Sequence, residues 1–174
     1  MALERRKIDP DCDRETLLSL HCMACYASEC AWARRAPYHE YEAEWLATSQ
    51  PASFLSDLKR SMKDARTIAE FWCEDDGQVV GYVWAVFRKV DGYSVVIAEV
   101  NDIAVVPEYR RRGLGLAMLR HAEEVARRHG ADLLRSGTGI ENIPSRELHK
   151  KAGFAAHRVD YERVLNPRLD GSAE

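Results

Sequence analysis

The residues best suited to chemistry lie between Arg110 and Leu116, where basic side chains and glycines stand together. An apolar run, Ser94–Val106, precedes them and predicts a strand, and an amphipathic helix follows Gly115. The first backbone N–H groups of a helix lack partners inside it, and the helix dipole places partial positive charge there. Glycine at this point lets the backbone approach a bulky anion. The segment therefore predicts a site for a phosphate or a pyrophosphate.

Glycine spacing separates the kinds of phosphate site. A P-loop needs Gly-x-x-x-x-Gly-Lys followed by Ser or Thr, and the chain has no such string. The dinucleotide fingerprint Gly-x-Gly-x-x-Gly begins correctly at Gly113 and Gly115, but Met118 occupies its third position. A second Gly-x-Gly, at residues 137–139, fails in the same way. What remains is Arg-x-x-Gly-x-Gly, with Arg110 and the first two glycines in the fixed places.

This pattern resembles the pyrophosphate-binding signature of the GCN5-related N-acetyltransferase (GNAT) superfamily, where it binds coenzyme A. A second stretch, Asn142–Phe154, is similar to the other signature of that family, an Asn followed by a helix ending in Leu-Tyr-x-Lys-x-Gly-Phe. His149 stands where most members carry Tyr. The two signatures occur in the family's order and cover roughly Val95–Leu165.

The resemblance implies an α/β (α+β) chain with the acyl-CoA N-acyltransferase fold, a mixed, mostly antiparallel central sheet with helices on both faces. It also implies an N-acetyltransferase that moves the acetyl group of acetyl-CoA, the donor co-substrate, to a primary amine by direct attack in a ternary complex. The alternative is a non-catalytic acyl-CoA-binding sensor module on the same fold. The cofactor-binding residues that the resemblance implies are the main-chain amides of Ile103, Ala104 and Val105, together with Arg110, Arg111, Arg112, Gly113, Leu114, Gly115, Leu116, Asn142 and Ser145.

Glu99 is the favoured general base, because an amine with a pKa of about 10.4 must lose a proton before it attacks. Glu99 interrupts an apolar strand, where an unpaired carboxylate is costly and its pKa tends to rise. Its place relative to Arg110 also resembles that of the catalytic Glu in the histone-acetylating branch of the family. Asp102 is the second candidate, and a structural hydrogen-bonding role is open for either residue.

Two residues of the second signature have competing interpretations. His149 is a candidate to protonate the coenzyme A thiolate in place of the usual Tyr, since histidine titrates near neutral pH. It is equally an ordinary polar residue on a helix surface. Asn142 either contacts the pantetheine arm or caps its own helix, with Pro144 close behind.

Composition agrees with one compact domain, predicted over residues 1–165 with a flexible tail over 166–174. The net charge of −3 gives no general attraction to nucleic acid, and three adjacent arginines are a small footprint for it. No apolar run approaches the ~20 residues of a membrane span. The N-terminus lacks the apolar core of a secretory signal, so a cytoplasmic location is expected. A homodimer stays open.

The five cysteines do not predict a disulfide framework, because their number is odd and no export signal precedes them. His21, Cys22 and Cys25 have a spacing that metal sites use, with Cys30 and His39 as further ligands. Cys22 and Cys25 lie within an apolar helical pattern, where cysteine behaves as a small core residue. Core packing is therefore the favoured interpretation, and no metal is expected.

Turn residues and hydrophobic periodicity place the elements along the chain. The predicted order is a strand at Leu3–Ile8, a helix from Asp9 to about Tyr26, helices at Tyr38–Ser49 and Ala52–Asp64, strands at Arg66–Cys73, Gln78–Lys89 and Ser94–Val106, a helix from Gly115 to Gly130, a strand at Ala131–Ser136, a helix at Asn142–Ala152 and a last strand at Phe154–Leu165.

The acceptor is set, by resemblance, in the region between the first two strands, Asp11–Asp64. Aromatic residues and carboxylates there suit a cationic amine, although packing and solvation explain them equally well. The sequence leaves open a small-molecule amine and a protein amino group. The residues concerned are Trp32, Tyr38, Tyr41, Trp45, Phe54, Glu40, Glu42 and Glu44.

Overall fold

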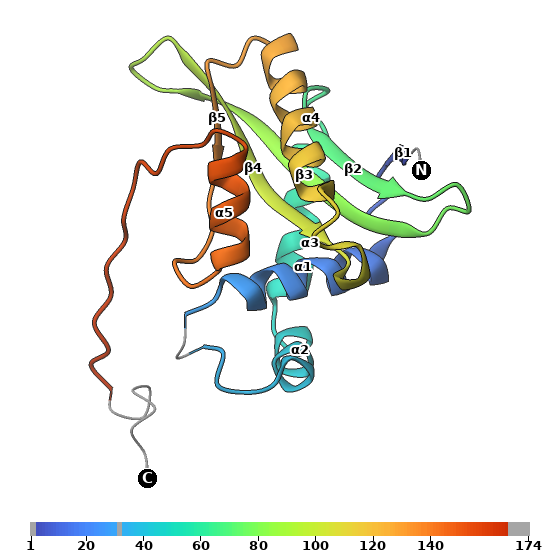
Figure 1. Ribbon diagram of the computed structural model, residues 1–174, viewed down its shortest axis with the longest axis vertical. Helices are drawn as coiled ribbons and strands as arrows, with labels where there is room; N and C mark the ends of the chain where they lie inside the picture. The colour runs from blue at the N-terminus through green and yellow to red at the C-terminus, as the bar shows by residue number, and fades with distance from the viewer. Residues whose placement is uncertain (1–2, 31–32, 167–174) are drawn as a thin grey trace.

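The computed structural model describes residues 3–30 and 33–166. Within them, five strands form one mixed sheet in the order β1-β2-β3-β4-β5 (Figure 1). Neighbouring strands from β1 to β4 are antiparallel, and β5 runs parallel to β4. This arrangement confirms the predicted mixed, mostly antiparallel sheet. The strands are β1 (Glu4–Lys7), β2 (Ile68–Cys73), β3 (Val79–Val90), β4 (Val95–Val105) and β5 (Leu133–Ser136).

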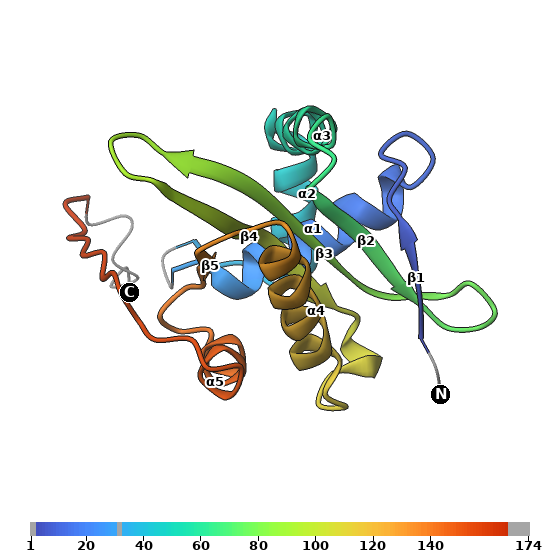
Figure 2. The ribbon, with the colours of Figure 1, turned by 90° about the horizontal axis from the view of Figure 1, so that it is seen from above.

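Helices cover both faces of the sheet (Figure 2). One face carries α1 (Arg14–Ser28), α2 (Tyr38–Leu46) and α3 (Gln50–Ser61), and the other carries α4 (Leu114–Arg128) and α5 (Ile143–Lys151). A short 3-10 turn, η1 (Pro107–Tyr109), leads from β4 toward α4. The helices predicted from periodicity are confirmed, with ends that shift by a few residues.

The alternation of side chains along β3 divides the core between the two faces. Tyr82 and Trp84 pack in the cluster beneath α1, α2 and α3, whereas Val83 and Ala85 pack against α4. Successive residues of a strand point to opposite faces, so a continuous apolar run predicts a strand buried on both sides.

A bulge interrupts β4 where it passes β3. Trp84 pairs with Asp102, and Ala85 pairs with Val100, so Asn101 is an extra residue on β4. The pairing of β4 with β5 covers residues 97–100 and ends at Ser136. Residues 101–105 of β4 therefore extend beyond the end of β5, and the sheet opens there into a split.

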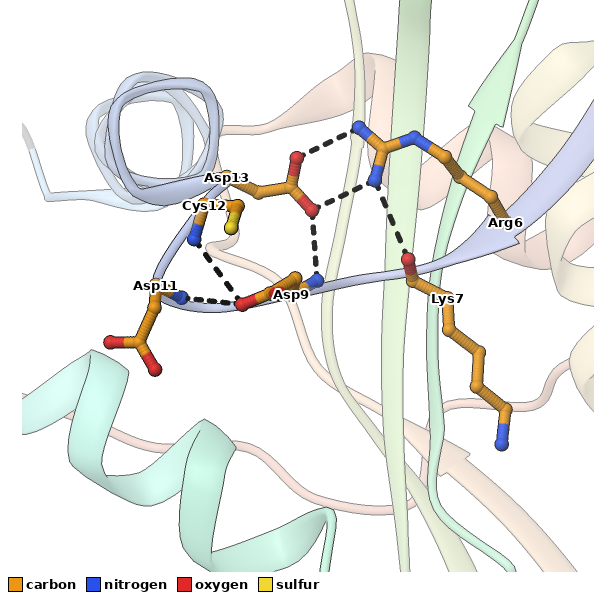
Figure 3. Close-up of polar contacts among 6 residues, drawn as sticks. All are labelled: Arg6, Lys7, Asp9, Asp11, Cys12 and Asp13. Carbon is orange, nitrogen blue, oxygen red and sulfur yellow. Dashed lines mark hydrogen bonds and ion pairs between the residues drawn. The ribbon is translucent and has the colours of Figure 1, made fainter.

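The helix predicted from Asp9 begins instead at Arg14, after a turn stabilised by carboxylates (Figure 3). The Asp9 side chain accepts the N–H groups of residues 11 and 12 at 3.0 and 3.2 Å. Asp13 accepts two N–H bonds from the Arg6 guanidinium, each 2.8 Å long, and the N–H of Asp9. These bonds compete with helical hydrogen bonds, which delays the start of α1 and ties it to β1.

The prediction of a last strand at Phe154–Leu165 is wrong. The described residues of this segment adopt no regular structure, and Figure 1 shows the segment leading away from the sheet. Val159 and Tyr161 are 61% and 94% exposed. Alternation alone does not form a strand, because a strand depends on cross-strand partners and on burial of one face.

Trp32 and residues 167–174 lie outside the described residues, so the predicted tail is untested there. Among the described residues, no helix is both long and apolar enough to cross a bilayer.

Candidate active site

The loop from β4 to α4 has the backbone conformation of an anion site. Gly113, the N-cap residue of α4, has φ 84°, and Arg111 has φ 63°. No side chain caps the helix, and its first turn contains no acidic residue. The N–H groups of residues 114–116 therefore lie at the positive end of the helix dipole without intrahelical partners. Arg127 and Arg128, at the opposite end, complement the negative pole.

Gly115 has a packing role that its spacing alone did not reveal. A Cβ placed on Gly115 would lie 3.0 Å from Cδ2 of Leu148 on α5. A Cβ placed on Gly113 would meet no atom within 4 Å. Gly113 thus supplies a left-handed backbone, and Gly115 allows the close contact between α4 and α5. The expectation that both glycines serve ligand approach stays a prediction.

Arg110 connects this loop to the open end of β4. Its Nε donates to the carbonyl of Val105 at 3.0 Å, and its guanidinium contacts Sδ of Met23 on α1 at 3.0 Å. The guanidinium of Arg112 lies over the ring of Tyr109, 5.1 Å from the centroid. Arg110, Arg111 and Arg112 are all exposed, so their charges face solvent beside the helix N-terminus.

The predicted carbonyl-binding amides lie in the split of the sheet. Ile103, Ala104 and Val105 follow the bulge, in the part of β4 that has no β5 partner. Strand separation leaves one edge of this segment free for a ligand, and a fixed amide there is suited to hold a carbonyl oxygen.

Asn142 and Ser145 form the N-terminus of α5. The Asn142 side chain accepts the N–H of Ser145 at 3.2 Å, and its Nδ2 donates to Oγ of Ser28 at 3.3 Å. The capping interpretation of Asn142 is confirmed by this geometry, and the same side chain ties α5 to the end of α1.

His149 lies on α5 beside the end of β5. Its Nδ1 contacts the carbonyl oxygen of Ser145 at 2.7 Å, and its Nε2 lies 2.8 Å from Oγ of Ser136. A carbonyl only accepts, so Nδ1 carries a proton and Nε2 faces the hydroxyl. Because Ser136 is the last paired residue of β5, this contact places His149 at the start of the split.

Glu99 is neither buried nor unpaired, contrary to the environment expected for it. Its side chain is 33% exposed, and its Oε2 accepts a bond from Nε of Arg88 at 2.7 Å. Its cross-strand partner Val86 lines a surface groove of about 580 Å³ between α3 and the sheet. Paired residues of two strands share a face, so Glu99 lies on the α1–α3 side of the sheet.

Asp102, the second candidate, occupies the more unusual environment. It is 9% exposed, and its Oδ2 accepts the hydroxyl hydrogen of Tyr82 and contacts Nδ1 of His21 on α1. Burial, and then the nearby Asp102 charge, raise the pKa of Tyr82 well above its ordinary value. His21 was considered in the sequence only as a neighbour of Cys22 and Cys25, because nothing local relates it to a residue on β4.

Most of the aromatic residues predicted to contact the acceptor pack within the protein instead. Phe54 and Trp45 are 6% and 4% exposed, and Phe54 stacks on the His21 ring with centroids 3.8 Å apart. Tyr38 and Tyr41 donate their hydroxyl hydrogens to carboxylates, those of Glu42 and Glu29, at 2.8 and 3.2 Å. The groove near Glu99 is lined instead by Asn101, Trp84 and side chains of α3 and the residues that follow it.

A bulged strand that separates from its parallel neighbour beside the uncapped N-terminus of α4 defines the class, the acyl-CoA N-acyltransferase fold. The profile of the Acetyltransferase (GNAT) family matches residues 30–154. The chain therefore belongs to the GNAT acetyltransferase family.

Named relatives agree with this assignment. The chain is 33% identical over 121 residues to a putative ribosomal protein bS18-alanine N-acetyltransferase of Bacillus subtilis, a match to 67% of this chain and 72% of that protein. It is 35% identical over 81 residues to an aminoglycoside N(6')-acetyltransferase type 1 of Klebsiella aerogenes, covering 45% and 53% of the two. A match to an uncharacterized N-acetyltransferase of Methanocaldococcus jannaschii, 32% identical over 90 residues, covers 51% of this chain and 40% of that protein.

The fold is also that of solved acetyltransferase structures. AAC(6')-Iy, in complex with the bisubstrate analogue CoA-S-monomethyl-acetylneamine, aligns with a TM-score of 0.63 at 18% identity over 94% of this chain and 99% of that one. At this level of identity the likeness shows the fold.

Proposed function

We propose that this protein transfers the acetyl group of acetyl-CoA to a primary amine by direct attack in a ternary complex. The observation that carries the proposal is the Arg110–Val105 hydrogen bond of 3.0 Å, which fixes the anion loop to the open end of β4. A diphosphate on the N-terminus of α4 then has its extended arm directed along residues 103–105 toward the bulge. The thioester of acetyl-CoA would reach the split, where the free amides face it.

The residues around the split divide the reaction between them. Among the amides of Ile103, Ala104 and Val105, those directed away from β3 polarise the acetyl carbonyl, while residues 110–116 hold the diphosphate. Attack of the neutral amine forms the C–N bond and breaks the C–S bond. We assign protonation of the departing thiolate to His149 in its imidazolium form, which carries a second proton on Nε2, and the contact of Nε2 with the Ser136 hydroxyl supports this role.

The acceptor enters from the α1–α3 face. The groove near Glu99 is lined by carboxylates of Asp57 and Asp64 and the amide of Asn101, and also by Arg60 and Lys63. Asp57 pairs with Arg60 and Asp64 with Arg66, so an amine would share these carboxylates with the arginines. Such groups suit an ammonium ion or a hydrogen-bonding amine. The named relatives suggest two acceptor types, an aminoglycoside and a protein N-terminus that begins with alanine.

An amine panel tests the activity. Purified protein is mixed with acetyl-CoA and one amine at a time, and thiol release and the acetylated product are measured together. Neamine, an alanine-initiated peptide and a lysine-containing peptide form the panel. We expect saturable thiol release with one of them.

Binding of acetyl-CoA without product from any amine would contradict the proposal. That outcome would favour the acyl-CoA sensor, which none of the named relatives supports.

A further inference from the structure

A buried polar cluster lies on the acceptor side of the split, and neither signature contains it. Asp102 on β4 contacts His21 on α1 and the hydroxyl of Tyr82 on β3. Tyr82 has no exposed surface, whereas the His21 side chain keeps 19% of its surface exposed. A buried carboxylate is costly, and apolar residues of similar volume would hold α1 on the sheet as well. The exposed part of His21 indicates a use beyond packing.

The ring of His21 is held in one orientation. Phe54 of α3 stacks on it, with centroids 3.8 Å apart and ring planes 7° from parallel. Trp45 of α2 meets its edge, with centroids 5.6 Å apart. Nδ1 faces the Asp102 carboxylate, so Nδ1 carries the proton and the lone pair of Nε2 stays available.

The neighbour of Nε2 is the thiol of Cys25, with Sγ 3.5 Å away. Burial, and then the charges of Asp102 and other acidic neighbours, raise the pKa of Cys25 to about 12. Cys25 therefore stays a thiol, which donates only a weak hydrogen bond and is a poor nucleophile. The cluster is thus suited to accept a proton rather than to form an acyl-cysteine.

The position of the cluster fits this role. Asp102 lies between the bulge at Asn101 and the amides of residues 103–105. Two residues beyond His21 on α1, Met23 contacts the guanidinium of Arg110. At the end of α1, Ser28 contacts Asn142 of α5. Helix α1 therefore crosses the opening of the split, and His21 lies next to the expected acetyl position.

We infer that His21, oriented by Asp102, is the general base that takes the proton of the acceptor amine. The inference rests on the proposed acetyl transfer. As the amine nitrogen bonds to the carbonyl carbon, its proton passes to Nε2, and the coenzyme A sulfur leaves with the electron pair of the C–S bond. Asp102 is a positioning residue that stabilises the imidazolium. The groups in contact with His21 are Asp102 from β4, Cys25 from α1, Phe54 from α3 and Trp45 from α2. Tyr82 from β3 contacts Asp102 rather than His21.

The principal variant is His21→Asn, which keeps an N–H directed at Asp102 and removes Nε2. With neamine or the alanine-initiated peptide, we expect kcat to fall by about 100- to 10,000-fold, the usual contribution of a general base. The rise of kcat/KM with pH that reports the base should disappear. Acetyl-CoA affinity by calorimetry should not change. His39→Asn is the matched control, because His39 is 78% exposed on α2 and contacts Glu40.

Chemical rescue by added imidazoles tests whether His21 acts as a base or only packs. In His21→Ala, added imidazoles should restore turnover in proportion to their basicity. Rescue that is independent of basicity, or absent, would mean that the ring only fills space. In Asp102→Asn the new side chain still accepts the Tyr82 hydrogen. The rise of kcat/KM should then occur at lower pH, because the imidazolium no longer has a carboxylate beside it. This variant also tests the inference if the His21 variants fail to fold, and an unchanged profile would overturn it.

The outcomes distinguish this inference from the proposed function. Normal wild-type turnover with an unchanged His21→Asn profile overturns the inference alone. The inference alone is also overturned if Glu99→Gln abolishes the rise of kcat/KM with pH while His21→Asn retains it, because Glu99 is then the base. No turnover by the wild-type protein with any amine of the panel overturns both.

Discussion

At Gly113 the chain turns from an arginine-rich loop into α4 through a left-handed backbone, with φ 84°. The helix N-terminus that results has neither a capping side chain nor an acidic residue, so its partial positive charge is available to an anion. The proposed chemistry of this site therefore depends on the backbone conformation of one residue. His149 shows the same point, since both of its ring nitrogens are engaged by two serines.

A carboxylate introduced at Gly113 tests the anion site. Asp tolerates positive φ better than most residues, so Gly113→Asp should fold, but its charge opposes a diphosphate. We expect acetyl-CoA affinity to fall at least about tenfold, equivalent to about 1.4 kcal/mol. Isothermal calorimetry measures the affinity.

The matched control for this change is Gly130→Asp at the opposite end of α4. Gly130 also has positive φ, 71°, and open space around it. It should bind acetyl-CoA like the wild type. Equal affinity in the two variants would contradict a diphosphate site at Gly113.

The elements are held around the split by close contacts between their ends. Asn142 caps α5 and bonds to Ser28 of α1, and the β5–α5 loop passes against that same end of α1. A Cβ on Gly139 would lie 2.1 Å from the Ser28 carbonyl oxygen, a backbone atom that yields little. A Cβ on Gly137 would meet no atom within 4 Å. The second Gly-x-Gly thus has one glycine required by packing.

Gly139→Ala and Gly137→Ala therefore form a matched pair. Gly139→Ala should lower the free energy of unfolding by about 1–3 kcal/mol, because the loop must move away from α1. Gly137→Ala should leave it unchanged or raise it by about 0.4–1 kcal/mol through the unfolded chain. Urea unfolding followed by circular dichroism measures both. Equal effects at the two positions would contradict the close contact with α1.

Across the whole molecule, hydrogen bonds of carboxylates join the sheet to the helices on each face. Asp13 at the start of α1 binds Arg6 of β1, and Glu70 of β2 binds His121 of α4 at 2.8 Å. The Arg6 hydrogen bonds lower the pKa of Asp13, and the His121 hydrogen bond lowers that of Glu70. The single domain over residues 1–165 remains a prediction from composition.

Stability should depend on these carboxylates in acid. A lowered folded-state pKa contributes stability that is fully present above the unfolded value of about 4 and is lost as pH falls through the folded value. Asp13→Asn should therefore destabilise the protein by about 1–2 kcal/mol at pH 7 and by less near pH 3. Urea unfolding at both pH values measures this.

Asp75→Asn, at an exposed position in the β2–β3 turn, is the control for this series. It should show little effect at either pH. An Asp13→Asn penalty that does not shrink in acid would mean that the lost stability is not electrostatic.

The sequence by itself determined the order of most helices and strands and the family resemblance, and it predicts an anion site at residues 110–116. These depend on local periodicity, on glycines with special backbone angles and on adjacent charges, which act within a few residues. It also predicted Glu99 as the base, from the cost of a carboxylate in an apolar strand, with Asp102 as the second candidate.

Only the tertiary structure decided which polar groups meet. It paired Glu99 with Arg88, brought His21 to Asp102 across 81 residues of sequence, and left residues 154–165 without a strand partner. Such contacts depend on how helices pack across the sheet and on where β4 and β5 separate. No local pattern encodes those distances, because they arise only when the apolar faces of separate elements are buried together.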